Sequence, residues 1–226
     1  RAPRRKVTAS APVVADSNLD VLDRPDGLLK TELEVLKELV RASKPREFLE
    51  IGMANGSSTV SVLAVLKELG SGRMTSVDPY QLTPTTVAPG AIPGYGGAGV
   101  KAVRDAGLSA LHTLIAAPDY LALPKLVEEG RRFDFVFIDG YHSFDYALID
   151  FFFADLLLRP GGTVVFHDSN RPTVLRVCQF VGANKAYRMI GPPLMLSYAS
   201  PARRALRRIG HMISGQAAKF EERRRR

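Results

Sequence analysis

The feature that most constrains the fold is a regular alternation of short apolar runs, each ending in a polar residue, with helical patterns. Strands are expected at residues 47–51, 74–77, 111–116, 133–138, 163–166, 187–190 and 194–198, and helices at 29–40, 57–69, 100–106, 120–129, 144–158 and 174–181. Continuous apolar strands that alternate with helices are typical of a parallel sheet covered on both faces. The sequence therefore predicts an α/β chain with a seven-stranded, mostly parallel sheet.

The charge of the chain lies mainly at its ends. Of the formal charge of +8, residues 1–6 carry +4 and residues 201–226 carry +7, which leaves −3 for the rest. We expect an N-terminal arm at 1–24, one domain at 25–200 and a basic amphipathic tail at 201–226, where apolar residues recur at helical spacing. Solvated ends are the simplest interpretation, and contact of the tails with nucleic acid or an anionic membrane is the alternative.

Composition excludes several classes of protein. The single cysteine, Cys178, excludes an intramolecular disulfide framework and a cysteine-based zinc site, and it fits a reducing, cytoplasmic location. Hydrophobic residues make up 46% of the chain, which excludes wholesale disorder. No apolar run approaches the roughly 20 residues that span a bilayer.

A glycine-containing turn follows the first predicted strand. In the segment EIGMANGSST, Gly52 and Gly56 allow a tight bend and close approach to a ligand at the start of a helix. The lysine of a phosphate-binding P-loop is missing, so a nucleoside triphosphatase is not expected. Asp78 ends the next strand, where a carboxylate can accept hydrogen bonds from both ribose hydroxyls. Together these features favour a nucleoside cofactor over a simple turn and helix cap.

Two further acidic residues, Asp139 and Asp168, end strands that a single helix joins. Because the carboxyl ends of parallel strands share one edge, these carboxylates are expected to be neighbours. Neighbouring carboxylates repel unless they are protonated or bridged by a cation, and oxygen ligands suit Mg²⁺. The alternative is that Asp139 touches the cofactor and Asp168 caps the next helix. His142 and His167 lie beside them in the sequence.

Four sequence strings carry a resemblance to a known family: EIGMANGSST, SVDPY, FDFVFIDGYHSFDYALIDF and LLRPGGTVVFHDS. Over roughly residues 26–200 the chain resembles the class I S-adenosylmethionine (SAM)-dependent methyltransferases, within the small-molecule O-methyltransferase branch of catechol, macrolide-sugar and cephalosporin type. The resemblance implies a Rossmann-like fold. Ala54 departs from the family, because many relatives have glycine there.

The resemblance also implies roles for individual residues. Glu50 would orient the methionine amino group of SAM, and Asp78, followed by Pro79, would hold the ribose hydroxyls. Residues near Pro118 and Asp119 would flank the adenine. Asp139 would lie against both cofactor and metal and would be a catalytic residue together with His142. The turn that wraps the methionine and ribose would comprise Gly52, Met53, Ala54, Gly56, Ser57 and Ser58.

A divalent metal, Mg²⁺ in the first instance, is implied at Asp139, His167 and Asp168. His167 stands where some relatives have an acidic ligand, and an imidazole favours transition metals. Some sugar O-methyltransferases have a catalytic histidine in a D-x-x-H arrangement similar to Asp139–His142. Imidazole is the natural base near neutral pH. The alternative is that His142 packs at the start of the helix.

These patterns predict a SAM-dependent O-methyltransferase that acts on a hydroxyl of a sugar, a phenol or another natural-product intermediate with help from a divalent metal. Residues 81–99, rich in glycine and proline, are expected to form a loop that covers the substrate. A homodimer is expected. The alternatives are a methyltransferase-fold protein whose tails bind RNA or membrane, and a dehydrogenase, which the glycine spacing disfavours.

Overall fold

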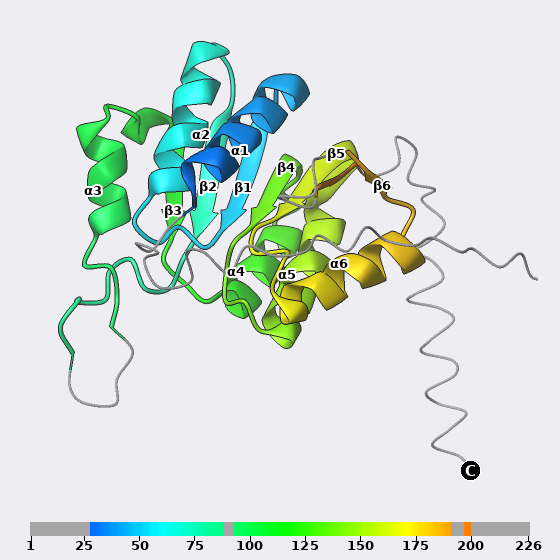
Figure 1. Ribbon diagram of the computed structural model, residues 1–226. Coiled ribbons are helices and arrows are strands. Elements are labelled where there is room, and N and C mark those ends of the chain that lie inside the picture. Colours follow the sequence, from blue (N-terminus) through cyan, green and yellow to red (C-terminus); the bar gives the residue numbers. More distant parts are fainter. Residues whose placement is uncertain (1–27, 88–92, 191–196, 200–226) are drawn as a thin grey trace, which may run out of the picture.

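The computed structural model describes residues 28–87, 93–190 and 197–199. Its sheet has the order β3-β2-β1-β4-β5-β7-β6 (Figure 1). The first five strands are parallel, and β7 runs antiparallel to both β5 and β6. The strands are β1 (Glu47–Ile51), β2 (Arg73–Val77), β3 (His112–Ile115), β4 (Phe133–Ile138), β5 (Leu158–Phe166), β6 (Arg188–Met189) and β7 (Ser197–Ala199).

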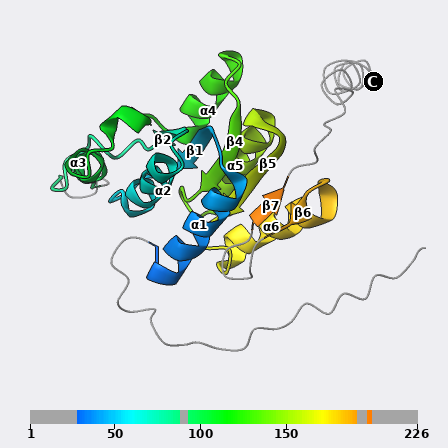
Figure 2. The same ribbon diagram turned by 90° about the horizontal axis from the view of Figure 1, so that it is seen from above.

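Six α-helices are present among the described residues. They are α1 (Lys30–Ser43), α2 (Ser57–Glu68), α3 (Ala98–Asp105), α4 (Asp119–Glu128), α5 (Phe144–Leu157) and α6 (Pro172–Asn184). Helix α1 packs on α2 and α2 on α3, whereas α4 packs on α5 and α5 on α6. The two groups lie on opposite sides of the sheet (Figure 2). None of the helices in the described ranges is long and apolar enough to cross a membrane.

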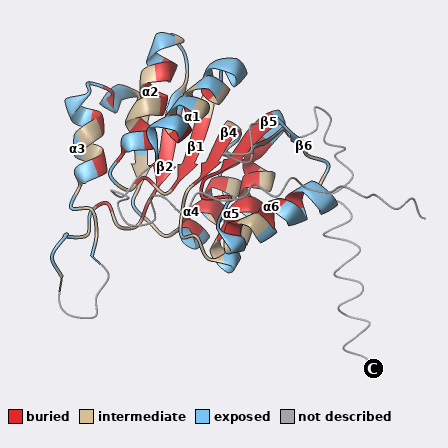
Figure 3. Ribbon diagram, in the orientation of Figure 1, coloured by how far each residue is buried: buried red, intermediate tan, exposed pale blue. Residues whose placement is uncertain are grey.

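The core consists of two hydrophobic layers that the strands separate. Successive strand residues point to opposite faces, so Leu49 and Ile51 pack toward α4, α5 and α6, whereas Phe48 packs toward α1 and α2. The rings of Phe48 and Phe135 stack at 4.7 Å in the second layer. Figure 3 shows the resulting buried sheet between two layers of helices with exposed outer surfaces. The expected α/β fold with a mostly parallel sheet is confirmed.

The strands at one edge differ from the expectation. The regular sheet consists of the five parallel strands, and the count of seven depends on β6 and β7, which have two and three residues. Strand β5 begins at Leu158, five residues before the expected start, because buried Leu158 pairs with Phe133 ahead of an irregularity in the register. The arm at 1–24 and the tail at 201–226 lie outside the described residues.

Candidate active site at the carboxyl ends of the strands

Backbone hydrogen bonds join the ends of the central strands into one continuous edge. The Gly52 amide donates to the Val77 carbonyl, and the Asp139 amide donates to the Ile51 carbonyl. The His167 amide donates to the Ile138 carbonyl in the same way. The turn after β1, Asp139 after β4 and His167 after β5 therefore lie side by side, as the sequence predicts.

Glycine is required at position 52 by both conformation and space. Its φ is +91°, and a Cβ there would lie 2.1 Å from the carbonyl oxygen of Asp139. Two residues on, Ala54 has a φ of 46°, which L side chains adopt at a cost. The Ala54 carbonyl accepts a 2.7 Å hydrogen bond from Nε2 of Gln81, which helps to hold this conformation. Ala54 therefore adopts a left-handed backbone conformation although it is not glycine.

Asp78 organises the same turn. Its Oδ2 accepts hydrogen bonds from the amides of Met53 (3.0 Å) and Ala54 (2.9 Å) and from Nε2 of Gln81 (3.2 Å). Its Oδ1 accepts one bond, from the Tyr80 amide at 2.8 Å. Each carboxylate oxygen has two lone-pair sites, so Oδ1 retains capacity for a further donor such as a ribose hydroxyl. The contact of Asp78 with a cofactor stays a prediction, and the free acceptor capacity of Oδ1 is compatible with it.

Glu50 lies beneath the turn and is fully buried. Its Oε1 accepts a hydrogen bond from Ser58 Oγ (2.7 Å), and its Oε2 accepts from Thr59 Oγ1 (2.8 Å) and Ser76 Oγ (2.6 Å). Burial raises the pKa of Glu50 to about 7, against the effect of these hydrogen bonds. The contacts in this structure join β1, β2 and α2. The predicted contact with a methionine amino group stays a prediction.

The remaining residues predicted to contact the cofactor surround this edge. Asp119 begins α4, is nearly buried, and accepts the Tyr120 amide at 2.7 Å. Asp150 on α5 lies near Asp119 and is fully buried. Its burial and the nearby Asp119 carboxyl raise the pKa of Asp150 well above its ordinary value. In the turn, Met53, Gly56 and Ser58 are buried and Ser57 is exposed, and Pro79 after β2 is half-buried.

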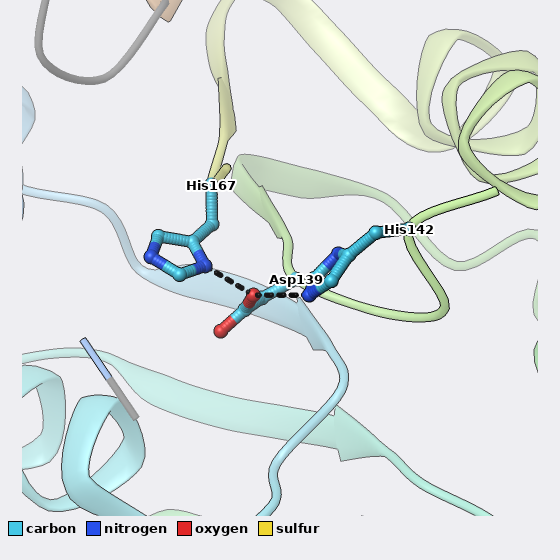
Figure 4. A group of neighbouring side chains, drawn as sticks. All are labelled: Asp139, His142 and His167. Carbon is cyan, nitrogen blue, oxygen red and sulfur yellow. Dashed lines mark hydrogen bonds and ion pairs between the residues drawn. The ribbon is translucent and has the colours of Figure 1, made fainter. Parts of the chain in front are cut away.

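Asp139, His142 and His167 face one another at the edge of the sheet (Figure 4). Nδ1 of His167 lies 2.6 Å from Oδ1 of Asp139, and Nε2 of His142 lies 4.0 Å from the same oxygen. His142 also approaches Asp168, with 3.2 Å between Nε2 and Oδ2. Arg171 Nε binds that Oδ2 at 2.7 Å. The predicted group of four is thus brought together, and Arg171 joins it.

The two histidines have opposite electrostatic surroundings. Burial works against a charge on His167, but its hydrogen bonds to Asp139 and to Glu32 raise its pKa to about 10. Burial lowers the pKa of His142, and the nearby carboxylates only partly oppose this effect. Burial raises the pKa of Asp139, and the bond from His167 opposes the rise. At neutral pH, His142 is the neutral imidazole that can accept a proton.

The donor atoms that could hold a metal ion differ from the predicted set. Ligand atoms of Asp139, His142 and His167 all lie within 4.8 Å of one another. Asp168, the third predicted ligand, is instead engaged by Arg171 and His142. Mg²⁺ prefers oxygen ligands, whereas imidazole suits transition metals. Two imidazoles and one carboxylate therefore fit a divalent transition-metal ion better than Mg²⁺.

Sequence reasoning missed three residues of this network: Glu32, Gln81 and Arg171. Glu32 carries the one signal that could have revealed it, because it precedes Leu36 and Val40 on the buried stripe of α1, where a carboxylate needs a partner. Gln81 fell within the predicted loop, and Arg171 is an ordinary surface residue by sequence. The roles of these residues depend on side-chain contacts between distant parts of the chain, which the pattern of residue types along the sequence does not predict.

Comparisons with known proteins agree with this architecture. A methyltransferase domain family matches residues 49–169, more than half of the chain. No match was found among curated protein sequences. The structure is similar to the O-methyltransferase TomG from Streptomyces achromogenes, involved in tomaymycin synthesis and solved with SAM, at 20% identity and a TM-score of 0.60, covering 77% of this chain and 82% of that one.

Two further solved structures give the same result. A putative O-methyltransferase from Klebsiella pneumoniae is 18% identical, with a TM-score of 0.63 and coverage of 80% of this chain and 84% of that one. An O-methyltransferase from Bacillus cereus, solved with SAH, is 18% identical, with a TM-score of 0.60 and coverage of 77% and 83%. At such identities the likeness shows a shared fold. The family match goes further: this chain belongs to the methyltransferase domain family.

Proposed function

We propose that this methyltransferase transfers the methyl group of SAM to a hydroxyl oxygen of a small molecule. The observation that carries the proposal is the direct packing of Gly52, in the predicted cofactor turn, on the backbone of Asp139, which contacts His167 and approaches His142. A cofactor on the turn therefore lies next to a group of acids and bases. The O-methyltransferases with the same fold agree with oxygen as the acceptor atom.

The residues at the turn fit a nucleoside cofactor. The left-handed Gly52 brings the turn directly against the backbone of Asp139, and Asp78 Oδ1 retains acceptor capacity for a ribose hydroxyl. Asp119, which we expect to flank the adenine, lies at the start of α4, beyond the end of β3. SAM supplies the activated methyl group, so the protein's task is to bind, orient and exclude water.

His142 is the base in this proposal. Its neutral imidazole accepts the proton of the acceptor hydroxyl while the oxygen forms a bond to the methyl carbon, and the carbon–sulfur bond breaks to leave a neutral thioether. Asp168 Oδ2, 3.2 Å from Nε2 of His142, orients the ring and stabilises the imidazolium that forms. Arg171 holds Asp168 in place. His142 is only partly buried, so an acceptor can reach it.

A second candidate role for these residues is metal binding. Asp139, His142 and His167 would hold a divalent ion of the transition series, and such an ion would lower the pKa of an acceptor hydroxyl. We expect calorimetry to show tighter binding of Mn²⁺ or Zn²⁺ than of Mg²⁺, and His167→Ala to weaken that binding. Absence of binding by any of the three ions would exclude this role and leave His142 as the base.

Cofactor binding tests the main proposal directly. Titration calorimetry should detect SAM binding by the intact chain, and Asp78→Asn should weaken it by about 10–100-fold, the effect expected for a charged hydrogen bond. Asp105→Asn, which changes an exposed carboxylate on α3, is the matched control and should bind normally. A screen of hydroxylated acceptors with labelled methyl donor would then identify the substrate. No SAM binding by the intact chain would refute the proposal.

The expected homodimer, the small-molecule partner and the contacts of the basic tails remain proposals. One observation favours a further protein contact: Phe144, Ile149 and Phe152 are exposed on α5, a helix that is apolar on nearly all sides. Sedimentation of the intact chain would test the dimer. Binding of RNA and of anionic vesicles, with and without residues 201–226, would test the tails.

A further inference from the structure

The imidazole of His167 is held between two carboxylates. Nδ1 faces Asp139 Oδ1 at 2.6 Å, and Nε2 faces Glu32 Oε2 at 3.3 Å. Glu32 comes from α1, 135 positions earlier in the chain and outside the residues 49–169 that match the methyltransferase family. Both residues are buried, with 8% of the His167 side chain and 10% of the Glu32 side chain exposed. The contact is therefore built into the protein interior.

From this geometry we infer that Glu32 is a positioning residue of the active site, which orients the His167 ring so that Nδ1 faces Asp139. A ring nitrogen that faces a carboxylate must carry a proton to make a favourable contact. Glu32 thereby fixes a hydrogen on Nε2. Because the two nitrogens belong to one rigid ring, holding Nε2 toward Glu32 also fixes the direction in which Nδ1 points.

The orientation of His167 matters for Asp139. With Oδ1 engaged by His167, the Asp139 carboxylate has a fixed rotation and a second oxygen that is free to face the cofactor or acceptor. If an ion takes the place of the proton on Nδ1, Glu32 still accepts the hydrogen on Nε2, since metal-ligating histidines usually donate their other ring N–H to a carboxylate. Glu32 acts through His167 in either case, so this inference depends on the proposed active site but not on the choice between base and metal.

Glu32 also has a structural role that the test must separate. Its Oε2 accepts the Leu29 amide at 2.8 Å, which caps the first turn of α1. Loss of the carboxylate would therefore weaken the helix as well as release His167. Leu29→Pro removes the capping donor and leaves the Glu32 carboxylate in place, and Leu29 has a φ of −62° that proline adopts readily. This variant should keep the contact between Glu32 and His167.

Imidazole ¹⁵N spectra of the full chain at one fixed pH provide the readout, and only four histidines contribute signals. His167→Gln assigns the ring. We expect Glu32→Ala to shift the His167 nitrogens, whereas Glu32→Gln, which keeps an acceptor oxygen, should preserve the pattern. Leu29→Pro should preserve it too. Glu38→Ala, which removes an exposed carboxylate from the same helix, is the control for charge.

Activity supplies a second readout once an acceptor is known. Loss of an orienting carboxylate typically costs about 10–100-fold in activity, so Glu32→Ala should lower kcat by this factor while SAM affinity stays unchanged. An unchanged His167 spectrum in Glu32→Ala, with SAM still bound, would overturn the inference and leave the proposed function standing. Failure of the intact chain to bind SAM would instead overturn the proposed function.

Discussion

Glu50 provides a prediction about stability that can be worked out from its surroundings. The side chain is fully buried, and its pKa rises from 4.5 to about 7 on folding. Because the folded state holds the proton more tightly than the unfolded state, protonation of Glu50 favours folding. This contribution is present in full below about pH 4.5 and is lost as the pH rises through about 7.

The magnitude follows from the two pKa values. At 1.36 kcal/mol per pH unit, the interval from 4.5 to about 7 corresponds to about 3 kcal/mol of unfolding free energy. Glu50→Gln carries no proton that titrates, and its amide keeps the size of the side chain and one acceptor for the hydroxyls of Ser58, Thr59 and Ser76. The variant should therefore gain about 2–3 kcal/mol relative to the parent chain between about pH 5 and about pH 8.

Urea unfolding followed by circular dichroism measures this difference, and circular dichroism is preferable because the chain contains no tryptophan. Comparing the two proteins at each pH cancels the titration of groups that do not interact with Glu50. For the control Glu38→Gln, on the exposed side of α1, the free energy of unfolding should differ from that of the parent chain by the same amount at all pH values. If the difference in unfolding free energy between Glu50→Gln and the parent chain were also independent of pH, the buried carboxyl would not change its proton affinity on folding, and the argument would fail.

Three further predictions concern the turn and the base. Gly52→Ala should lower the free energy of unfolding by about 2–5 kcal/mol and weaken SAM binding, because it adds a strained φ and a clash with Asp139. The control is Gly70→Ala, with φ +67° and no atom near its Cβ, which should cost about 1–2 kcal/mol and leave SAM binding intact. Urea unfolding measures the stability of both variants, and calorimetry measures their SAM binding. His142→Asn should lower kcat by about 10²–10⁴-fold at unchanged SAM affinity, and a normal kcat would exclude it as the base. Because burial lowers the pKa of His142, activity should reach its plateau on the alkaline side of a pKa below 6.5, and the acidic limb of the pH profile should disappear in His142→Asn.

The sequence was sufficient to predict the sheet, because that information is local. Most apolar runs form strands within a residue of their expected bounds. The exceptions are β5, which Leu158 extends ahead of the Pro-Gly-Gly segment, and β7, which begins at Ser197 and not at the expected residue 194. The polar residues that follow the strands were predicted to share one edge, since strand direction fixes where they end. The structure confirms this shared edge through the backbone hydrogen bonds between neighbouring strands, and the apolar pattern of the sequence determines where those strands lie.

The partners of the polar side chains could not be predicted in the same way. Asp78 and Glu50 were expected to face a cofactor, yet the turn amides and three buried hydroxyls take up most of their acceptor sites. These contacts depend on how α2 packs on β1 and β2. Residue type and strand position specify a carboxylate at the edge, but only the packed structure shows which of its oxygens remains available.

The site also shows why a histidine can replace an acidic residue after β5. An acid at 167 would place a third carboxylate beside Asp139 and Asp168, and such a group requires a cation to offset its repulsion. His167 instead donates toward Asp139 and toward Glu32, so hydrogen bonds within the protein hold the group together. Loss of Glu32 removes one of the two contacts, and loss of His167 leaves Glu32 and Asp139 buried without their shared partner. A family member with acidic residues at both positions 139 and 167 should therefore depend on a metal ion more strongly than this chain does.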